Sequence, residues 1–236
     1  MTEIILKQIN NEFIDLSKSE KFVAHYEKSN SYSKYIIDVE INSGIYEDDI
    51  LAPLLTSDEE TVVIDAGANV GLFALHVLPL ASRIYCIEPT PVHLEVLEDV
   101  AQCFGASIVT CHDVALSSYN GECYFNEVEN NTTENKISTE STGLKVRCST
   151  LKTFFEENNI EAVDLLKLDI EGAEVELFFK DSTIYHTLQE KCRAVYIECH
   201  SVPVEMAIVK NMKIMGFEHA AAKRSSSHYF INPMEV

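Results

Sequence analysis

Three acidic residues each end a short apolar run in the middle of the chain. Asp65 ends "TVVID", Glu88 ends "RIYCIE" and Asp113 ends "SIVTCHD". Because the carboxyl ends of parallel strands meet at one edge of a sheet, we expect the three carboxylates to line one cleft. There Glu88 can accept hydrogen bonds from both hydroxyls of a ribose, and Asp113 can bind an adenine amino group. A cleft with three acids favours a cationic or amine-bearing nucleoside and is unfavourable beside a diphosphate.

The loop that follows the first of these runs is rich in glycine. It reads "DAGANVG", with Gly67 and Gly71 as its glycines, and it contains neither G-x-G-x-x-G nor G-K-[ST]. Those two patterns place backbone amides against a dinucleotide or a nucleoside triphosphate. S-adenosylmethionine, a nucleoside with an amino-acid tail and no phosphate, therefore fits these residues better than NAD.

A second group of chemically active residues follows two later apolar runs. Lys167, Asp169 and Glu171 stand in "KLDIEGAE", and Glu198 and His200 stand in "IECH". Alternation along a strand points Lys167 and Asp169 to one side, and Glu198 and His200 likewise share a side. We expect these groups to meet at one cleft, with Asp169 contacting the acceptor or cofactor and Lys167 paired with an acid.

His200 is the predicted general base, because the ordinary pKa of histidine lies near neutral pH; a surface histidine at a strand end is the alternative. Glu171 is a further catalytic candidate. A divalent ion held by Asp169, Glu198 and His200 is a separate hypothesis, since such an ion would lower the pKa of an acceptor hydroxyl. Glu174 and Glu176, next along the chain, are predicted on a solvated or N-terminal face of a helix.

The order of apolar patterns predicts an α/β domain that positions these groups. From Thr61 onward, β-branched runs alternate with helical patterns, which indicates a parallel sheet with crossover helices. The polar stretch at 129–143 has no apolar period and is predicted to be a loop. Residues 1–55 differ: "EIILKQINNEFIDL" has helical spacing, and we expect an N-terminal cap over the open end of the sheet. The predicted division is thus 1–55 and 56–236.

Composition narrows the class of partner. The formal net charge is −20 with only 18 Lys and Arg residues, which disfavours binding to nucleic acid. Seven scattered cysteines form no C-x-x-C pair, as is typical of reduced thiols. The amino-acid sequence contains neither a signal-peptide pattern nor an apolar run long enough to span a bilayer. We therefore expect a cytoplasmic protein without membrane association, and the oligomeric state is left open.

Together these motifs resemble one family. "VVIDAGANVG" is similar to motif I of class I S-adenosylmethionine-dependent methyltransferases, and "YCIEP" resembles their ribose-binding segment. "GIYEDDI", "DVALS" and above all "LLKLDIEGAEVELF" resemble the FkbM-type members of that class. The resemblance runs from about Gly44 to Phe217 and implies the Rossmann-like class I methyltransferase fold: a mostly parallel seven-stranded sheet with helices on both faces and an N-terminal helical cap.

The resemblance also implies roles for individual residues. The methionine part of the cofactor would be surrounded by the loop residues Asp65, Ala66, Gly67, Asn69 and Gly71, the ribose would bind Glu88, and the adenine would lie by Asp113, Val114 and Ala115. Glu47 in "IYEDD" matches a family acid that would face the amino-acid end.

The function implied by the resemblance is O-methylation of a hydroxyl on a small molecule or glycan. Two other functions stay open. A nicotinamide-dependent oxidoreductase could use a similar sheet, although the absence of G-x-G-x-x-G counts against it. A non-catalytic S-adenosylmethionine-binding protein would keep the pocket without turnover, and the retained Asp169 and His200 count against that.

Overall fold

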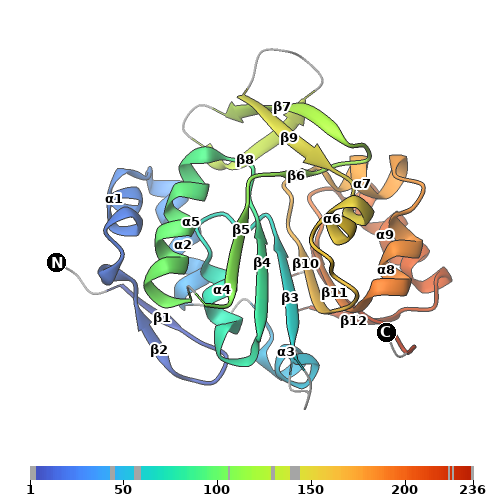
Figure 1. Ribbon diagram of the computed structural model, residues 1–236, viewed down its shortest axis with the longest axis horizontal. Helices are drawn as coiled ribbons and strands as arrows, with labels where there is room; N and C mark the ends of the chain where they lie inside the picture. The colour runs from blue at the N-terminus through green and yellow to red at the C-terminus, as the bar shows by residue number, and fades with distance from the viewer. Residues whose placement is uncertain are drawn as a thin grey trace.

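The computed structural model describes residues 4–42, 46–55, 60–105, 107–128, 131–138, 144–222, 224 and 226–234. Its centre is a seven-stranded sheet in the order β12-β13-β11-β10-β3-β4-β5, shown in Figure 1. In this sheet β13 runs antiparallel to the other six strands, which are parallel to one another. The strands are β3 (Val62–Ala66), β4 (Arg83–Ile87), β5 (Val109–His112), β10 (Val163–Leu168), β11 (Cys192–Glu198), β12 (Glu218–Ala221) and β13 (Ser227–Ile231).

Helices cover both faces of this sheet, because its strands are apolar on both sides. One face packs on α6 (Leu151–Glu157), α7 (Glu174–Lys180), α8 (Ile184–Lys191) and α9 (Val202–Ile214). The other face packs on α3 (Asp48–Leu55), α4 (Leu72–Val77) and α5 (Pro91–Phe104). The predicted class, a mostly parallel seven-stranded sheet between two layers of helices, is confirmed.

The N-terminal segment differs from its prediction. The stretch with helical spacing forms a hairpin, β1 (Ile5–Lys7) and β2 (Phe13–Asp15), followed by the short 3-10 helix η1 (Leu16–Lys18). The helices α1 (Glu20–Lys28) and α2 (Ser31–Asn42) come next. Leu6 and Leu16 each turn a side chain into one cluster with α4 and α5, so burial against those helices outweighs the local helical period. Figure 1 shows this segment beside α4 and α5. The division at residue 55 stays a prediction.

A second sheet replaces most of the predicted loop at 129–143. It has four strands in the order β6-β9-β7-β8: β6 (Ala115–Leu116), β7 (Gly121–Val128), β8 (Asn131–Ser138) and β9 (Leu144–Ser149). The loop prediction is thus wrong over β8, and positions 129, 130 and 139–143 lie outside the described residues. The strand is polar because it lies at the edge of its sheet, where pairing with β7 alone fixes its backbone. The second sheet crosses the end of the main sheet to which β6 leads (Figure 1).

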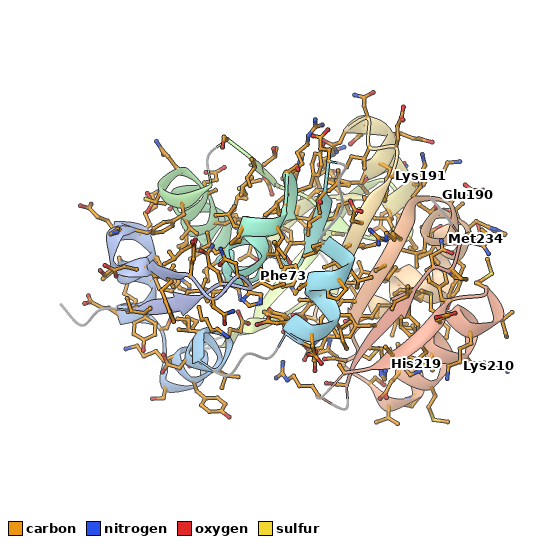
Figure 2. All side chains as sticks on the ribbon, turned by 90° about the horizontal axis from the view of Figure 1, so that it is seen from below. Phe73, Glu190, Lys191, Lys210, His219 and Met234 are labelled. Carbon is orange, nitrogen blue, oxygen red and sulfur yellow. The ribbon has the colours of Figure 1, made fainter. Side chains whose placement is uncertain are left out.

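Strand register places the acidic and basic side chains of the main sheet side by side. Asp65 of β3 is opposite Lys167 of β10, which in turn is opposite Tyr196 of β11. Phe73 projects from α4 into the interior, where its ring lies 5.5 Å from the Lys167 Nζ atom (Figure 2). None of the helices in the described ranges is both long enough and apolar enough for a membrane span.

Candidate active site

A hollow of about 820 Å³, counting its open mouth, lies at the carboxyl ends of β3, β4 and β10. Its walls come from α2 and Tyr46, from the loop after β3 with the start of α4, from the end of β4 with the start of α5, from the start of β6, and from the end of β10 with the segment that follows it. Among the lining residues are Glu40, Tyr46, Gly67, Asn69, Phe73, Glu88, His93, Val114, Ala115, Lys167, Asp169 and Glu171.

The glycine loop fits closely against the segment that follows β10. Gly67 has φ of +77°, and a Cβ atom added there would lie 1.7 Å from the backbone oxygen of Asp169. Only glycine allows this approach. Asn69 also has a positive φ, of 48°, a conformation that asparagine tolerates better than most residues. The loop therefore holds its backbone at the pocket wall, where a ligand can approach the main chain.

Glu88 is held rigidly at the end of β4. Its Oε2 atom accepts a hydrogen bond from the Asn69 backbone N–H at 2.9 Å, and its Oε1 atom accepts one from Thr90 N–H at 2.8 Å. Burial raises the pKa of Glu88, but hydrogen bonds from His93 and Thr90 outweigh burial and lower the pKa overall. Each carboxylate oxygen has a further lone pair, so an ionised Glu88 can still accept both hydroxyls of a ribose.

Replacing Glu88 with glutamine is expected to weaken binding of S-adenosylmethionine by about 1 to 3 kcal/mol, because a buried acceptor of hydroxyl hydrogen bonds is lost. Calorimetric titration of the cofactor measures this change. Glu95→Gln removes the same charge from an exposed position of α5 and is the matched control. Equal affinities for Glu88→Gln and the unmodified protein would remove Glu88 from the cofactor site.

Lys167 joins two acids beneath the pocket. Its Nζ atom lies 3.0 Å from Asp65 Oδ1 and 3.6 Å from Asp169 Oδ2, and it donates to the Gly67 carbonyl at 3.3 Å. Burial lowers the pKa of Lys167, but the charges of Asp65 and Asp169 outweigh burial and raise the pKa, so the amine stays charged. The predicted ion pair of Lys167 with an acid of the cleft is confirmed.

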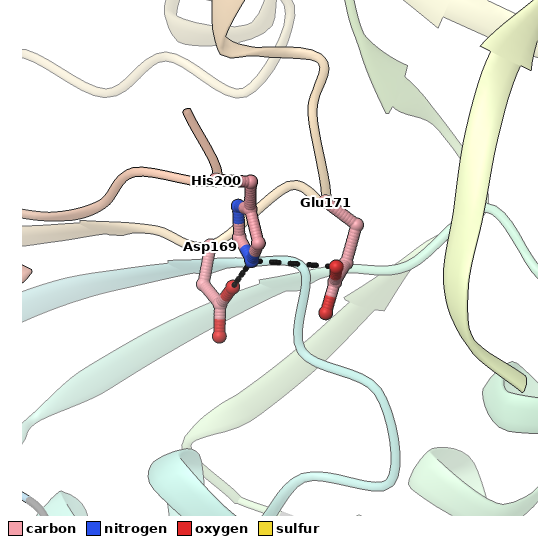
Figure 3. A group of neighbouring side chains, drawn as sticks. All are labelled: Asp169, Glu171 and His200. Carbon is pink, nitrogen blue, oxygen red and sulfur yellow. Dashed lines mark ion pairs between the residues drawn. The ribbon is translucent and has the colours of Figure 1, made fainter. Parts of the chain in front are cut away.

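His200 lies among three carboxylates, and Figure 3 shows it with two of them, Asp169 and Glu171. Its Nδ1 atom lies 2.8 Å from Glu174 Oε1, while its Nε2 atom lies 3.3 Å from Glu171 Oε2 and 3.8 Å from Asp169 Oδ1. Glu174 is buried, so of its two predicted places the N-terminal end of a helix is right and the solvated face is wrong. The residue begins α7 and turns inward toward His200. Asp169 and Glu171 line the hollow, whereas His200 stands behind them.

The pKa values in this group follow from burial and from the neighbouring charges. Burial lowers the pKa of His200, but the hydrogen bond to Glu174 and the charges of Glu171, Glu174 and Asp169 raise it to about 9. Burial raises the pKa of Glu171 to about 8, with a further upward contribution from Asp169 and a downward one from His200. At neutral pH the imidazole of His200 is therefore protonated and cannot take a further proton. The histidine predicted as a base is held as a cation between acids.

The group with metal-ligand spacing differs from the predicted one in a single residue. Among the described residues, Asp169, Glu171 and His200 each offer a ligand atom within 4.8 Å of the others. Glu198 lies outside this group, and its Oε2 atom is 3.4 Å from Arg224. Glu171 takes its place because a positive φ of 48° turns the chain after Asp169 back toward His200. The ion pairs of His200 with Asp169 and Glu171 are sufficient to explain why these three side chains lie together.

The structure places the predicted cofactor residues in two groups. Gly67, Asn69, Glu88, Val114 and Ala115 line the hollow. The others do not line it. Asp65 and Ala66 are fully buried behind the loop, and Gly71 is the N-cap residue of α4. Asp113 is exposed after β5, and Glu47 is buried with its backbone N–H donating to Tyr229 Oη. Their assignment to the cofactor stays a prediction.

No pattern in the amino-acid sequence marked several residues of the site, Phe73 and His93 among them. Glu40 and Tyr46 reach the pocket from the N-terminal segment, and Glu174 orients His200. Glu40 stands in a helical stretch without any motif, so only the packing of α2 brings it to the pocket. The spacing of Glu174 after Asp169 was visible, but the histidine that Glu174 contacts is 26 residues away in sequence.

The residues of the hollow fit S-adenosylmethionine better than a nucleotide with phosphates. Among the described lining residues, Lys167 is the one lysine or arginine, and Asp65 and Asp169 already neutralise it. A diphosphate would therefore meet Glu88 and Asp169 without a matching cation. In S-adenosylmethionine the ribose would bind Glu88, the adenine would lie by Val114 and Ala115, and the methionine part would lie by Gly67.

Comparison with known proteins assigns this site to a family. The family model described as "Methyltransferase FkbM domain" matches residues 65–223. The chain belongs to the FkbM methyltransferase family. The matched region holds the glycine loop, Glu88, Asp169, Glu171 and His200, as the sequence resemblance implied. Membership of this family confirms the resemblance that the motifs of the amino-acid sequence indicated.

One curated relative shares part of the amino-acid sequence. The curated protein "Methyltransferase sdnD" of Sordaria araneosa is 30% identical over 151 residues, which make up 49% of this chain and 58% of that protein. The chain thus spans less than two thirds of that relative's length.

Two solved structures match most of the chain. The METTL16 MTase domain aligns with a TM-score of 0.52 at 10% identity, over 98% of this chain and 87% of that one. Magnesium protoporphyrin IX methyltransferase (ChlM) from Synechocystis PCC 6803, with bound SAM, aligns with a TM-score of 0.50 at 13% identity, over 91% and 92%. At these identities the two structures support the fold alone.

Proposed function

We propose that the protein transfers the methyl group of S-adenosylmethionine to a hydroxyl group of a small molecule or glycan. One observation carries this proposal: two carboxylates, Asp169 and Glu171, line the cofactor pocket beside Gly67, where the methionine part of the cofactor would lie. Carboxylates there can orient a hydroxyl by accepting its hydrogen bond and can remove its proton. The acceptor is not fixed by the fold, because one fold supports many substrates.

The cofactor supplies an electrophilic methyl group on a sulfonium, and the residues of the chain do the rest. Glu171 orients the acceptor by accepting a hydrogen bond from its hydroxyl group, while Asp169 contacts the bound acceptor or cofactor beside it. With S-adenosylmethionine bound, the hydroxyl oxygen would form its bond to the methyl carbon while the sulfur–methyl bond broke and its electron pair returned to sulfur. The hydroxyl proton passes to the carboxylate of Glu171. Holding the two reactants in line supplies much of the rate acceleration.

In this proposal His200 is a positioning residue. Its imidazolium is held by Glu174 on one side and faces Asp169 and Glu171 on the other, so it keeps the two carboxylates apart from each other and oriented. The role of general base moves from His200 to Glu171, because a carboxylate whose pKa is raised to about 8 is basic enough to accept a hydroxyl proton and is ionised above that pH. A divalent ion on Asp169, Glu171 and His200 would have to displace the His200 proton, and exhaustive chelation tests that alternative.

The proposal is tested in two steps. Calorimetric titration of S-adenosylmethionine, S-adenosylhomocysteine and NAD is expected to give micromolar binding of the two adenosyl compounds and none of NAD. The methyl group of a labelled cofactor is then followed into a panel of hydroxyl acceptors and the matching amines, including glycans. Transfer to amines but not to hydroxyls would contradict O-methylation. Tight cofactor binding with no transfer to any acceptor would favour the non-catalytic binding protein.

A further inference from the structure

Glu40 is an acidic residue of the pocket wall that no sequence motif contains. It lies on α2, and the hollow that it lines also holds Asp169, Lys167 and Gly67. Ile37 and Ile41 of the same helix are buried in a cluster with α4 and α5, so α2 is anchored while Glu40 faces the pocket. The carboxylate of Glu40 therefore stands at the methionine end of the proposed cofactor site, on an element outside the matched family region.

The charges around Glu40 leave the pocket with an excess of negative charge. Lys167 is the cation that acts on Glu40, while Asp169, Asp65 and Glu198 act on it as like charges. Burial and these acids raise the pKa of Glu40 to about 7, with Lys167 opposing the shift. Lys167 is in turn shared between Asp65 and Asp169. A ligand with a positive charge at this end of the pocket would compensate Glu40, whereas a neutral ligand would leave it uncompensated.

The two forms of the cofactor differ in just this property. S-adenosylmethionine carries a positively charged sulfonium in addition to its ammonium and carboxylate. S-adenosylhomocysteine has the same ammonium and carboxylate, but an uncharged thioether replaces the sulfonium. We propose that the carboxylate of Glu40 selects the cofactor by charge, favouring S-adenosylmethionine over the product S-adenosylhomocysteine and so promoting exchange after each turnover. This inference rests on the use of S-adenosylmethionine in the proposed function and is independent of the acceptor.

Binding measurements test the proposal without any acceptor. Both ligands are titrated at pH 8, above the pKa of Glu40, into the unmodified protein and Glu40→Gln. Because an opposite charge at close range shifts a carboxylate pKa by one unit or more, and one unit is a factor of ten, Glu40→Gln is expected to weaken S-adenosylmethionine binding about tenfold. Binding of S-adenosylhomocysteine is expected to change less than about twofold, so the preference ratio falls.

Two variants separate charge selection from damage to the helix. Asp38→Asn removes a charge from an exposed position of the same helix, where Asp38 accepts a hydrogen bond from Tyr26 Oη, and it should leave both affinities unchanged. Glu40→Asp keeps the charge and should retain the preference for S-adenosylmethionine.

If Glu40→Gln weakens the binding of both ligands equally, the proposal is overturned, because contact with the ammonium that both ligands share, or a loss of structure, then explains the weaker binding. If Glu40→Gln leaves both affinities unchanged, and with them the preference for S-adenosylmethionine, the proposal is overturned as well. In either case, binding of S-adenosylmethionine by the unmodified protein would leave the proposed function standing. A protein that binds neither ligand would contradict both.

Discussion

Glu171→Gln is expected to lower kcat by about 10²- to 10⁴-fold, the usual contribution of a positioned general base. Glutamine keeps the shape of the side chain and its place at the pocket wall, but it cannot accept the hydroxyl proton. Cofactor affinity should change little, because the expected loss is confined to the chemical step. Steady-state kinetics with a methyl acceptor and calorimetry with S-adenosylmethionine measure the two quantities.

The pH dependence of the unmodified enzyme gives a second readout for Glu171. The base acts only when it is deprotonated, and burial raises its pKa to about 8. Below pH 8 we expect the rate to fall about tenfold per pH unit, and above pH 8 to level off until His200 loses its proton near pH 9. The residual activity of Glu171→Gln should lack the rise through pH 8.

The control for this substitution is Glu190→Gln, which removes an exposed carboxylate of α8 at the periphery of the molecule (Figure 2). Its kcat and pH profile should match those of the unmodified enzyme. A Glu171→Gln enzyme with the same kcat and the same pH profile would show that another group accepts the proton.

Lys167→Met is expected to lower the free energy of unfolding by about 3 to 5 kcal/mol at pH 8, the cost of breaking a buried ion pair. The substitution leaves Asp65 fully buried without a cation, and Asp65 Oδ2 already lacks a hydrogen-bond partner among the described residues. Chemical denaturation of the cofactor-free protein measures the loss. The double substitution Asp65→Asn with Lys167→Met removes both charges and should recover most of the stability.

The loss of unfolding free energy in Lys167→Met should depend on pH, because Asp65 can take up a proton once its cationic partner is gone. Burial already raises the pKa of Asp65 while Lys167 lowers it, so removing Lys167 raises the pKa further. A carboxyl whose pKa is higher in the folded than in the unfolded state stabilises the fold at low pH, and this contribution is lost as pH rises through the folded value. Lys167→Met should therefore be less destabilised at pH 5 than at pH 8. An equal loss of unfolding free energy at pH 5 and at pH 8 would indicate that lost packing against Phe73, and not the unpaired charge of Asp65, destabilises the variant.

Elements with a repeating apolar pattern were predictable because the pattern itself is the cause of their burial. Continuous apolar runs such as "VDLLKL" form strands covered by helices on both faces, and "TVVID" forms β3. The hairpin β1–β2 and strand β8 were mispredicted for the opposite reason. Their backbone pairing depends on contacts with distant segments, so their local periodicity carries little information.

The amino-acid sequence by itself determined the glycine loop after β3, the acid at the end of β4 and the family. In each of these the chemistry depends on residues close together in the chain: Gly67 must allow a close backbone approach, and Glu88 must end a strand next to that loop. Such local requirements leave a readable pattern.

Only the tertiary structure decided the charge states of the site residues and the side chains that they contact. His200 became a cation rather than a base because Glu174 and Glu171, from another segment, lie within ion-pair distance. Glu40 reached the pocket because α2 packs on α4, far along the chain. A pKa depends on burial and on charges brought together in space, and no spacing along the sequence fixes those distances.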